Sequence, residues 1–517
     1  MNQEEKLVNN DIQIPIHLNF SPPQKPNNDS EFKYNFSKNK KKILFFLSII
    51  FVFCFSIYIE NKGYNITSFI KIIKENLGLE EKPNKKCYEL EPIHLFELGL
   101  NNTPHTICDN KLSNQNHICY VNTHNDYFYH KFGVTCTMKN IILDPSRSSQ
   151  TNIIYKGPVD NIHRGFPILY EGFFNMNCES KNNLDTYDYL YRTYFNSWNY
   201  NYNKNEKLLE LAPGKTIFFL SRNQDSPNLF HGISELINAL AMMELFKLKP
   251  EDIQIIFLES MTLKDDPLYD LYKSIISRGG EPIYIRDLNK KFIISSGIHV
   301  PINVDSPLFM NANFPNCGEY PGRAYQLLND LVLKYMNIST YEDKFLTDNE
   351  IYYYPKSVSD NSKMQFKKYI TIQWRKVWPK GRQGQYRILG NGPELAEKLA
   401  KALPKDFLVR LVDTAGLSIR EQISLMHKTD YLVGIHGAGL SLAIFMSNKS
   451  ILHEVLPARN MKVLTLMSAL SGHKTYSDIL KAKMRQIDGS EYFYFKEEHF
   501  VKKVLLHMRE NNYFVKN

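Results

Sequence analysis

The sequence lacks a concentration of lysine and arginine in the part expected to fold. Its 517 residues include 63 basic and 54 acidic side chains, which gives a formal net charge of +9. The densest basic run lies near the N-terminus, at Lys38, Lys40, Lys41 and Lys42. A nucleic-acid-binding fold is expected to carry a basic stripe on one face. We therefore expect no nucleic-acid partner, and a solvated surface with one local basic cluster.

Metal and dinucleotide signatures are missing as well. There is no Cys-x-x-Cys pair and no Cys/His zinc spacing. The acidic pair Asp265-Asp266 stands before Pro267 and is typical of a helix N-terminus, so we predict no metal site. A dinucleotide-dependent oxidoreductase needs Gly-x-Gly-x-x-Gly after the first strand of a domain. The chain instead reads RKVWPKGRQGQYR after Trp374, which argues against that class.

One uncharged apolar run, residues 43–59, is long enough to cross a bilayer as a helix. The basic cluster precedes it, so the positive-inside rule places the N-terminus in the cytosol and the rest of the chain in the lumen. A cleaved signal peptide would begin closer to the N-terminus, whereas residues 1–42 are polar. We expect a single-pass type II anchor in the membrane of the endoplasmic reticulum or Golgi, where bilayers are thinner.

Cysteine usage agrees with an oxidising compartment. Of seven cysteines, Cys54 lies within the apolar run, and the other six would be lumenal. An even number in such a compartment predicts disulfides, although the sequence leaves their pairing open. These six are Cys87, Cys108, Cys119, Cys136, Cys178 and Cys317.

Composition and periodicity divide the chain into successive segments. The N-terminal part comprises a disordered cytosolic tail at 1–42, the anchor at 43–59 and a stem at 60–90. After it we expect an α/β domain with a disulfide-rich start at 91–340, a linker at 341–367, a Rossmann-like domain at 368–490 and a C-terminal helix at 491–517.

Buried strands alternate with helices in both halves of the folded part. In the first half, strands at 216–221, 253–258 and 281–285 alternate with helices at 231–246 and 269–277. In the second half, strands at 369–374, 407–412, 431–435 and 451–456 alternate with helices at 393–403, 419–427 and 439–446. This rhythm predicts an α/β fold of parallel sheets covered on both faces. Two such units imply two Rossmann-like domains facing across a cleft, with ligands at the C-terminal strand ends.

A glycine loop is the most informative stretch. In DYLVGIHGAGL, residues 430–440, a buried strand runs into His436-Gly437-Ala438-Gly439, and a helix is expected to begin at once. Glycines let the backbone approach a ligand closely, and the N–H groups of a first helical turn attract anions such as a diphosphate. His436 could add a donor. The alternative is a tight turn whose glycines serve only packing.

The stretch 413–457 resembles glycosyltransferase family 61, which includes plant β-1,2-xylosyltransferases and lumenal N-acetylglucosaminyltransferases. The resembling features are Leu417-Ser418, Glu421-Gln422, Asp430, Gly434-x-His436-Gly437-Ala438-Gly439-Leu440, Phe445-Met446, Glu454 and Pro457. Two outer blocks also fit, namely Arg387-Ile388-Leu389-x-Asn391 and Asn228-Leu229-Phe230-His231. The chain departs from the pattern at Gln373-Trp374, at Gly390, and at Glu235, where several relatives have aspartate.

The resemblance implies an inverting glycosyltransferase of the two-domain type called GT-B. The donor would be a UDP-sugar, most often of xylose or N-acetylglucosamine, and the acceptor a hydroxyl of a glycan or glycoprotein. No cofactor is implied, and metal dependence stays open. The implied donor-binding residues are Arg375, Arg387, Asn391, His436, Gly437, Ala438, Gly439, Leu440 and Glu454.

The catalytic base is expected from the first half of the fold. His231 and Glu235 are four residues apart near the start of a helix, so they face the same side, and we favour His231. The alternative for both is an ordinary helix-end pair. A second alternative for the whole chain is a membrane-anchored protein that binds nucleotide sugars or glycans without turnover.

Overall fold

A computed structural model of the chain separates residues Met1–Lys82 from Pro83–Asn517. The structure describes residues 92–101, 104–122, 132–148, 169–178, 194–203, 206–221, 228–258, 268–301, 322–338, 350–353, 366–374, 387–447, 449–456, 463–487 and 490–514. The expected tail, membrane span at 43–59 and stem lie outside these residues. Within the described ranges, no helix is both long and apolar enough to cross a membrane.

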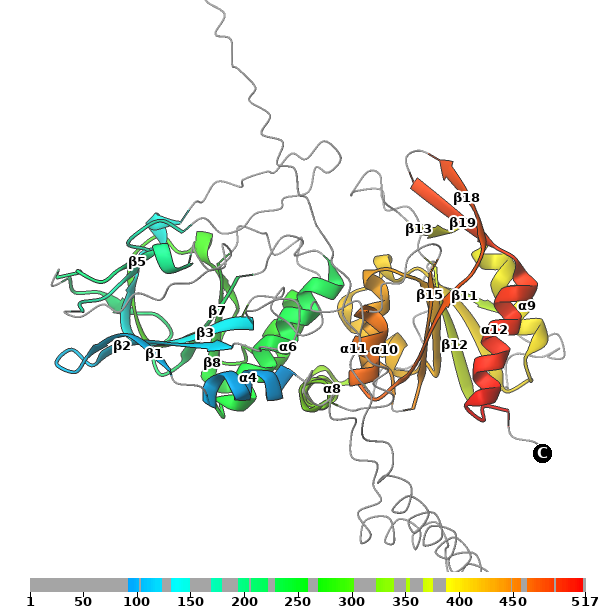
Figure 1. The fold of residues 1–517 in the computed structure, drawn as a ribbon, viewed down its shortest axis with the longest axis horizontal. Helices are drawn as coiled ribbons and strands as arrows, with labels where there is room; N and C mark the ends of the chain where they lie inside the picture. Colours follow the sequence, from blue (N-terminus) through cyan, green and yellow to red (C-terminus); the bar gives the residue numbers. More distant parts are fainter. Residues whose placement is uncertain are drawn as a thin grey trace, which may run out of the picture. The chain divides into compact units, whose positions relative to one another are not determined.

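The first sheet combines a parallel part with an antiparallel part (Figure 1). Its order is β1-β2-β3-β10-β7-β8-β9. Strands β10, β7, β8 and β9 are parallel, whereas β1, β2 and β3 are antiparallel to their neighbours. The strands are β1 His105–Asn110, β2 Gln115–Asn122, β3 Phe132–Leu143, β7 Thr216–Leu220, β8 Ile253–Phe257, β9 Ile283–Tyr284 and β10 Phe292–His299, with short β4 Phe174–Asn175, β5 Trp198–Asn199 and β6 Leu209–Glu210. The helices are α4 Pro92–Asn101, α6 Leu229–Leu245, α7 Tyr269–Ile275 and α8 Arg323–Met336.

The second sheet is parallel apart from one edge strand. Its order is β11-β14-β12-β15-β16-β17, and only β11 pairs in the antiparallel sense. Figure 1 shows α9 and α12 on one face of it and α10 and α11 on the other. The strands are β11 Glu350–Tyr353, β12 Lys368–Gln373, β14 Phe407–Val412, β15 Tyr431–Ile435, β16 Ile451–Leu456 and β17 Lys474–Ile479. The helices are α9 Gly392–Ala402, α10 Ile419–His427, α11 Val463–Leu470 and α12 Glu497–Glu510, with 3₁₀ helices η9 Thr414–Gly416 and η10 Ala438–Phe445.

A third, smaller sheet has the order β13-β19-β18. Its strands are β13 Arg387–Leu389, β18 Ala482–Ile487 and β19 Ser490–Phe495. This sheet carries the Arg387 block, and β13 contacts β15.

Burial explains why the central strands of the second sheet are almost wholly apolar. Every residue of β14, β15 and β16 is buried, as expected when helices cover both faces of a parallel sheet. Helix α9 begins with Pro393 in its first turn and turns Leu395 and Leu399 toward the sheet. Helix α10 begins with a complete capping box between Ser418 and Glu421.

The second sheet contains a point where connections leave in opposite directions. From β12 the chain runs through α9 to β14 on one side, and from β15 it runs through η10 to β16 on the other side. The C-terminal ends of β12 and β15 therefore lie side by side, with Gln373 paired to Gly434. In the first sheet, β7 lies between β10 and β8, and α6 follows β7. Ligands of open α/β sheets bind outside such points.

The α/β prediction is confirmed, with three differences in the elements. The helix expected at 439–446 is the 3₁₀ helix η10, because its run AGLSLAIF is apolar and buried on all sides and offers no amphipathic stripe. The helix expected at 491–517 begins at Glu497, after β19. Strand β11 falls inside the expected linker at 341–367. The domain boundaries themselves stay predictions.

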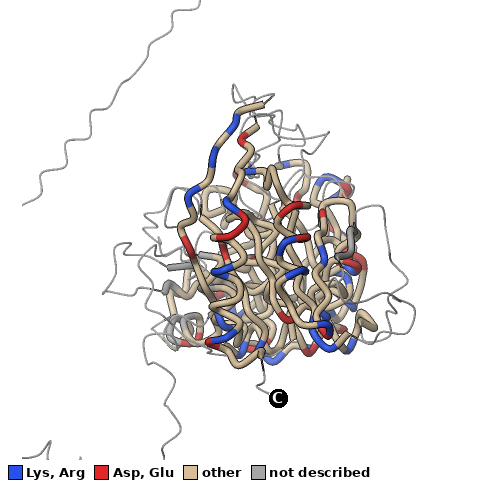
Figure 2. Tube along the Cα trace, turned by 90° about the vertical axis from the view of Figure 1, so that its right-hand side faces the viewer, with Lys and Arg blue, Asp and Glu red and all other residues tan. Residues whose placement is uncertain are grey.

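Two disulfides confirm the prediction that cysteines of the chain pair. Cys108 is bonded to Cys178, and Cys119 is bonded to Cys136. Cys87 and Cys317 lie outside the described residues. Lysines and arginines are interspersed with acidic residues along the side of the chain that Figure 2 shows.

Candidate functional site

The loop after β15 is where a buried stretch of chain reaches solvent. Residues 431–436 and 440–446 are buried, whereas Gly437, Ala438 and Gly439 are half-exposed. The His436 N–H donates to the Val455 carbonyl at 3.0 Å, so pairing with β16 continues up to the start of the loop. The loop therefore opens at the C-terminal edge of the sheet, beside the end of β12.

Three successive backbone N–H groups in this loop are available to a ligand. The first bond of η10 runs from the Leu440 N–H to the Gly437 carbonyl at 3.0 Å. The N–H groups of Gly437, Ala438 and Gly439 have no acceptor within the described part of the chain. Consecutive free N–H groups of this kind bind anions. The anion site stays a prediction, and in a 3₁₀ helix it depends on these donors.

The glycines are required by a close approach to Gln373, the last residue of β12. A Cβ on Gly439 would lie 2.2 Å from Nε2 of Gln373, and a Cβ on Gly434 would lie 3.0 Å from a methyl group of Leu440. Nε2 of Gln373 itself donates to the Thr414 hydroxyl at 3.1 Å. Gln373 thus forms one wall of the loop. In the sequence Gln373 stands out only as a departure from the family pattern, although its position at the end of a strand could have marked it as a residue of the site.

His436 forms a buried pair with Glu454. Its Nδ1 is hydrogen-bonded to Oε1 of Glu454, whose side chain is fully buried, and Oε2 of Glu454 has no further partner within the described residues. Burial raises the pKa of Glu454, and His436 and Arg387 oppose that rise. Because Nδ1 is engaged, Nε2 is the ring atom of His436 that is left for a ligand.

Arg387, in strand β13 of the third sheet, is hydrogen-bonded to the glycine loop. Its Nη1 donates to the backbone carbonyl of His436 at 3.2 Å. Burial lowers the pKa of Arg387, while Glu491 and Glu454 act in the opposite sense. A guanidinium stays charged at neutral pH, and its other N–H groups are suited to phosphate. The structure thus brings Arg387, His436 and Glu454 together, whereas Arg375 lies outside the described residues.

Two other predicted donor-binding residues have side chains engaged elsewhere. The Asn391 amide donates to the Phe495 carbonyl at 2.8 Å and accepts from the Phe495 N–H at 3.1 Å. It therefore joins the start of α9 to β19. Leu440 is fully buried, against Gly434. These contacts hold the loop in shape, and contact of either residue with a donor stays a prediction.

The two candidate bases, His231 and Glu235, lie on α6, one helical turn apart. Asn228 caps this helix, and its Oδ1 accepts from the Phe230 N–H at 3.1 Å. Burial lowers the pKa of His231 to about 4, so its ring is neutral at pH 7. Glu235 is only 3% exposed. Helix α6 packs against η10 within one apolar cluster, which connects the helix of the expected base with the glycine loop.

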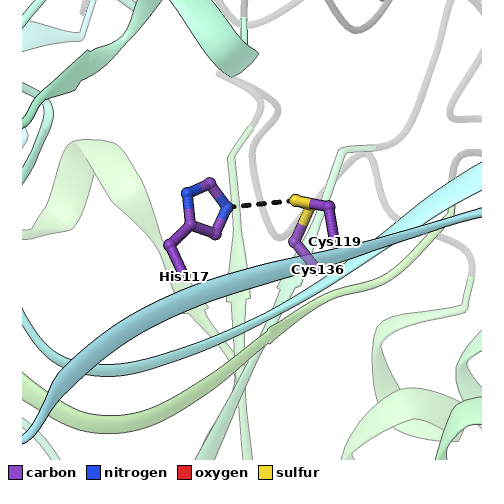
Figure 3. Close-up of side chains that lie close together, drawn as sticks. All are labelled: His117, Cys119 and Cys136. Carbon is purple, nitrogen blue, oxygen red and sulfur yellow. Dashed lines mark hydrogen bonds between the residues drawn. A yellow bond between two sulfur atoms is a disulfide. The ribbon is translucent and has the colours of Figure 1, made fainter. Parts of the chain in front are cut away.

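Two groups of potential metal ligands occur among the described residues. In the first, His117 lies beside Cys119 and Cys136, with Nε2 of His117 3.3 Å from Sγ of Cys119 (Figure 3). Both sulfurs belong to one disulfide and are not thiolates, so this group is not a metal site. His117 instead stacks on Trp198 with ring centroids 4.0 Å apart. The second group consists of His453, Asp478 and His507, none of which is in a disulfide.

Comparison with known proteins identifies part of the chain. Residues 271–452 match the family described as Glycosyltransferase 61. The matched range contains Arg387 and the glycine loop. It ends just before Glu454 and begins after His231 and Glu235, so it carries no information on the expected base. No curated protein matches the chain significantly.

Proposed function

We propose that the chain, whose residues 271–452 match glycosyltransferase family 61, is a glycosyltransferase that transfers a sugar from a UDP-sugar. The acceptor is a hydroxyl of a glycan or glycoprotein. The observation that carries the proposal is the set of three N–H groups at Gly437–Gly439 that have no acceptor among the described residues. They stand at the edge of the sheet where its connections diverge, which is where nucleotides bind in open α/β sheets.

The reaction requires stabilisation of a departing diphosphate. In an inverting transfer the acceptor oxygen attacks the anomeric carbon, the bond from that carbon to the diphosphate oxygen breaks, and negative charge grows on the terminal phosphate. Fixed donors that already point at this charge lower the barrier most. The loop N–H groups, Nε2 of His436 and the remaining N–H groups of Arg387 supply such a set. Because these groups are cationic or N–H donors, we propose that no cofactor is required.

The acceptor hydroxyl must lose its proton as it attacks. We assign this role to His231, with Glu235 as the alternative base or as the group that orients it. A neutral imidazole is the form that accepts a proton, and His231 is neutral at pH 7, although burial also makes it a weaker base than an ordinary histidine. The parallel strands β7, β8 and β9, with α6 after β7, support a second Rossmann-like unit and so a GT-B arrangement with donor and acceptor sides.

The sugar is proposed as xylose or N-acetylglucosamine, and the site of action as the lumen of the endoplasmic reticulum or Golgi. The two disulfides support an oxidising compartment. The apolar run at 43–59 supports a type II anchor.

The experiment is a nucleotide-release assay on the full-length chain in detergent, with UDP-xylose, UDP-N-acetylglucosamine and UDP-arabinose, each with glycopeptide acceptors. The proposal expects acceptor-dependent release of UDP from one donor, and unchanged release in EDTA. UDP binding without release from any donor would favour the alternative, a nucleotide-sugar-binding protein. Absence of both binding and release would reject both functions.

A further inference from the structure

The second group of potential ligands lies on the opposite face of β16 from the glycine loop. Side chains alternate along a strand, so His453 and Glu454 point to opposite faces of the sheet. Glu454 meets His436, whereas His453 meets Asp478 of β17 and His507 of α12. This second cluster is therefore separated from the proposed donor site by the sheet itself.

Each of the three side chains contributes one atom to the cluster, and these atoms all lie within 4.8 Å of one another. Nε2 of His453 lies 3.1 Å from Oδ2 of Asp478, and Nε2 of His507 lies 3.2 Å from the same oxygen. Two ligands bound to one zinc ion at tetrahedral angles are about 3.3 Å apart, since each is about 2.0–2.1 Å from the metal. The observed spacing is thus that of neighbouring ligands around one ion.

The contact between His453 and Asp478 is close but lies outside good hydrogen-bond geometry, and the carboxylate attracts a positive charge at this position. His453 is fully buried, and neither its Nε2 nor Oδ2 of Asp478 makes a hydrogen bond within the described residues, although they are 3.1 Å apart. A buried nitrogen and a buried carboxylate oxygen that face each other without a hydrogen bond are costly unless something lies between them.

Tyr431 explains why lone pairs converge here. Its hydroxyl lies 3.0 Å from Nδ1 of His453 and 3.4 Å from Nδ1 of His507. A hydroxyl has one proton and two acceptor lone pairs, so it can donate to only one of the two rings. At least one neutral ring must donate from Nδ1 and present a bare Nε2 to the Asp478 carboxylate. If both rings donate to Tyr431, both Nε2 lone pairs point at the shared oxygen.

We propose that Nε2 of His453, Nε2 of His507 and Oδ2 of Asp478 bind one divalent transition-metal ion, most favourably zinc. Two imidazole nitrogens and one carboxylate oxygen are a donor set that zinc accepts, with solvent as a fourth ligand.

The surroundings supply the outer contacts that metal ligands need. Metal-binding histidines donate their second N–H to a polar partner, and ligating carboxylates are themselves hydrogen-bonded. Tyr431 is the partner of both rings, and Lys503 binds the other oxygen of Asp478 at 2.9 Å. Tyr476 stacks on His507 with centroids 3.7 Å apart and fixes its plane. The ion would join α12 to β16 and β17, so its role is to secure the C-terminal helix.

The test measures zinc and cobalt binding to the full-length chain after treatment with a chelator and desalting. With Zn²⁺ we expect about one tightly bound ion per chain, and a rise in Tm of about 3 °C in excess zinc. Co²⁺ should give visible absorption bands of a nitrogen- and oxygen-bound ion. His507→Gln and Asp478→Asn should weaken zinc binding about 10- to 100-fold and abolish the bands.

His499→Gln is the matched control, because His499 is an exposed histidine on the same helix. It should bind zinc as the parent does. UDP binding should be the same in all variants, since the site is on the other face of the sheet. A parent chain that binds no zinc and shows no rise in Tm would overturn the proposal even if the variants fail to fold. Equal zinc binding in the parent, His507→Gln and Asp478→Asn would overturn it as well, since the ion would then be held elsewhere.

Discussion

At the scale of single residues, the two ring nitrogens of His436 have different roles. Nδ1 is bound by the buried Glu454, and Nε2 is left for the ligand. The two functions can be separated, because the amide nitrogen of asparagine can replace Nδ1 but nothing in asparagine replaces Nε2. Loss of the Glu454 contact would leave a buried carboxylate uncompensated, which is costly.

We predict that His436→Asn folds with nearly the parent stability but binds UDP about 10-fold more weakly, since one donor to the phosphates is lost. His436→Ala should bind UDP as weakly and also lose about 3 kcal/mol of stability, because Glu454 is then unpaired. Calorimetric titration with UDP and urea unfolding measure the two effects. Unchanged UDP affinity in His436→Asn would remove Nε2 from the site.

A second residue-scale prediction concerns Gly439. Its Cβ position is 2.2 Å from the flexible end of Gln373. We predict that Gly439→Ala pushes this amide aside and weakens UDP binding about 10-fold, with a stability change of about 1 kcal/mol or less. Adding Gln373→Ala should restore most of the affinity, because the obstructing amide is gone. A double variant that binds no better than Gly439→Ala would show that the methyl group acts in another way.

Sequence analysis could identify these residues but not their contacts. The glycines, His436 and Glu454 were marked by the family pattern, and Arg387 by its block. The pairing of His436 with Glu454 depends on the register of β15 against β16, which no local pattern encodes. The amide of Asn391 was expected at the donor, yet it pairs with Phe495, 104 residues away.

At the scale of elements, α6 positions the proposed base. Asn228 caps the N-terminus of this helix and so fixes where the first turn, which carries His231, begins. We predict that Asn228→Ala lowers stability by about 1 kcal/mol and that Asn228→Asp largely preserves it, as for helix caps in general. Urea unfolding of both variants measures the difference. Equal stabilities would mean that the cap contributes nothing to this helix.

The same helix allows a test of the base. We predict that His231→Gln lowers kcat about 100-fold and leaves the UDP affinity unchanged, since a base acts on the acceptor and not on the donor. Glu235→Gln should have a smaller effect on kcat if Glu235 only orients His231. If both variants turn over like the parent, the base lies elsewhere.

Elements were predicted well where the apolar rhythm was long. The strands and helices of both β-α-β stretches were predicted, because buried parallel strands and amphipathic helices leave clear patterns. The antiparallel strands β1, β2 and β3 were not placed, because their burial is irregular and their pairing joins distant segments. Helix α12 and strand β19 merged in the prediction, since FYF and FVKKVL form one apolar series.

At the scale of the whole molecule, several neutral histidines sit in the interior. Burial lowers the pKa of His117 to about 3 and of His299 and His473 to about 4, whereas an unfolded histidine titrates near its ordinary value of about 6.5. Below pH 6.5 these histidines therefore bind protons in the unfolded chain but stay neutral in the folded chain. Stability conferred by these groups is complete above pH 6.5 and falls as the pH drops toward 4.

We predict that each of the three histidines lowers the free energy of unfolding by about 1.4 kcal/mol per pH unit between pH 6.5 and about pH 4. Urea unfolding at pH 7.5, 6.5 and 5.5 measures the slope. His473→Asn should reduce it by about 1.4 kcal/mol per pH unit, the share of one buried histidine. A free energy of unfolding that does not change between pH 7.5 and 5.5 would contradict the burial of neutral histidines.

The most direct test of the donor site is hydrogen–deuterium exchange of the full-length chain with and without saturating UDP. The N–H groups of Gly437, Ala438 and Gly439 have no acceptor within the described chain, so they should exchange fast in the free protein. Bound diphosphate would accept hydrogen bonds from them, and we predict that a peptide spanning 436–440 slows at least 10-fold in UDP. Unchanged exchange of this peptide, with protection elsewhere in the chain, would show that the diphosphate binds at another place.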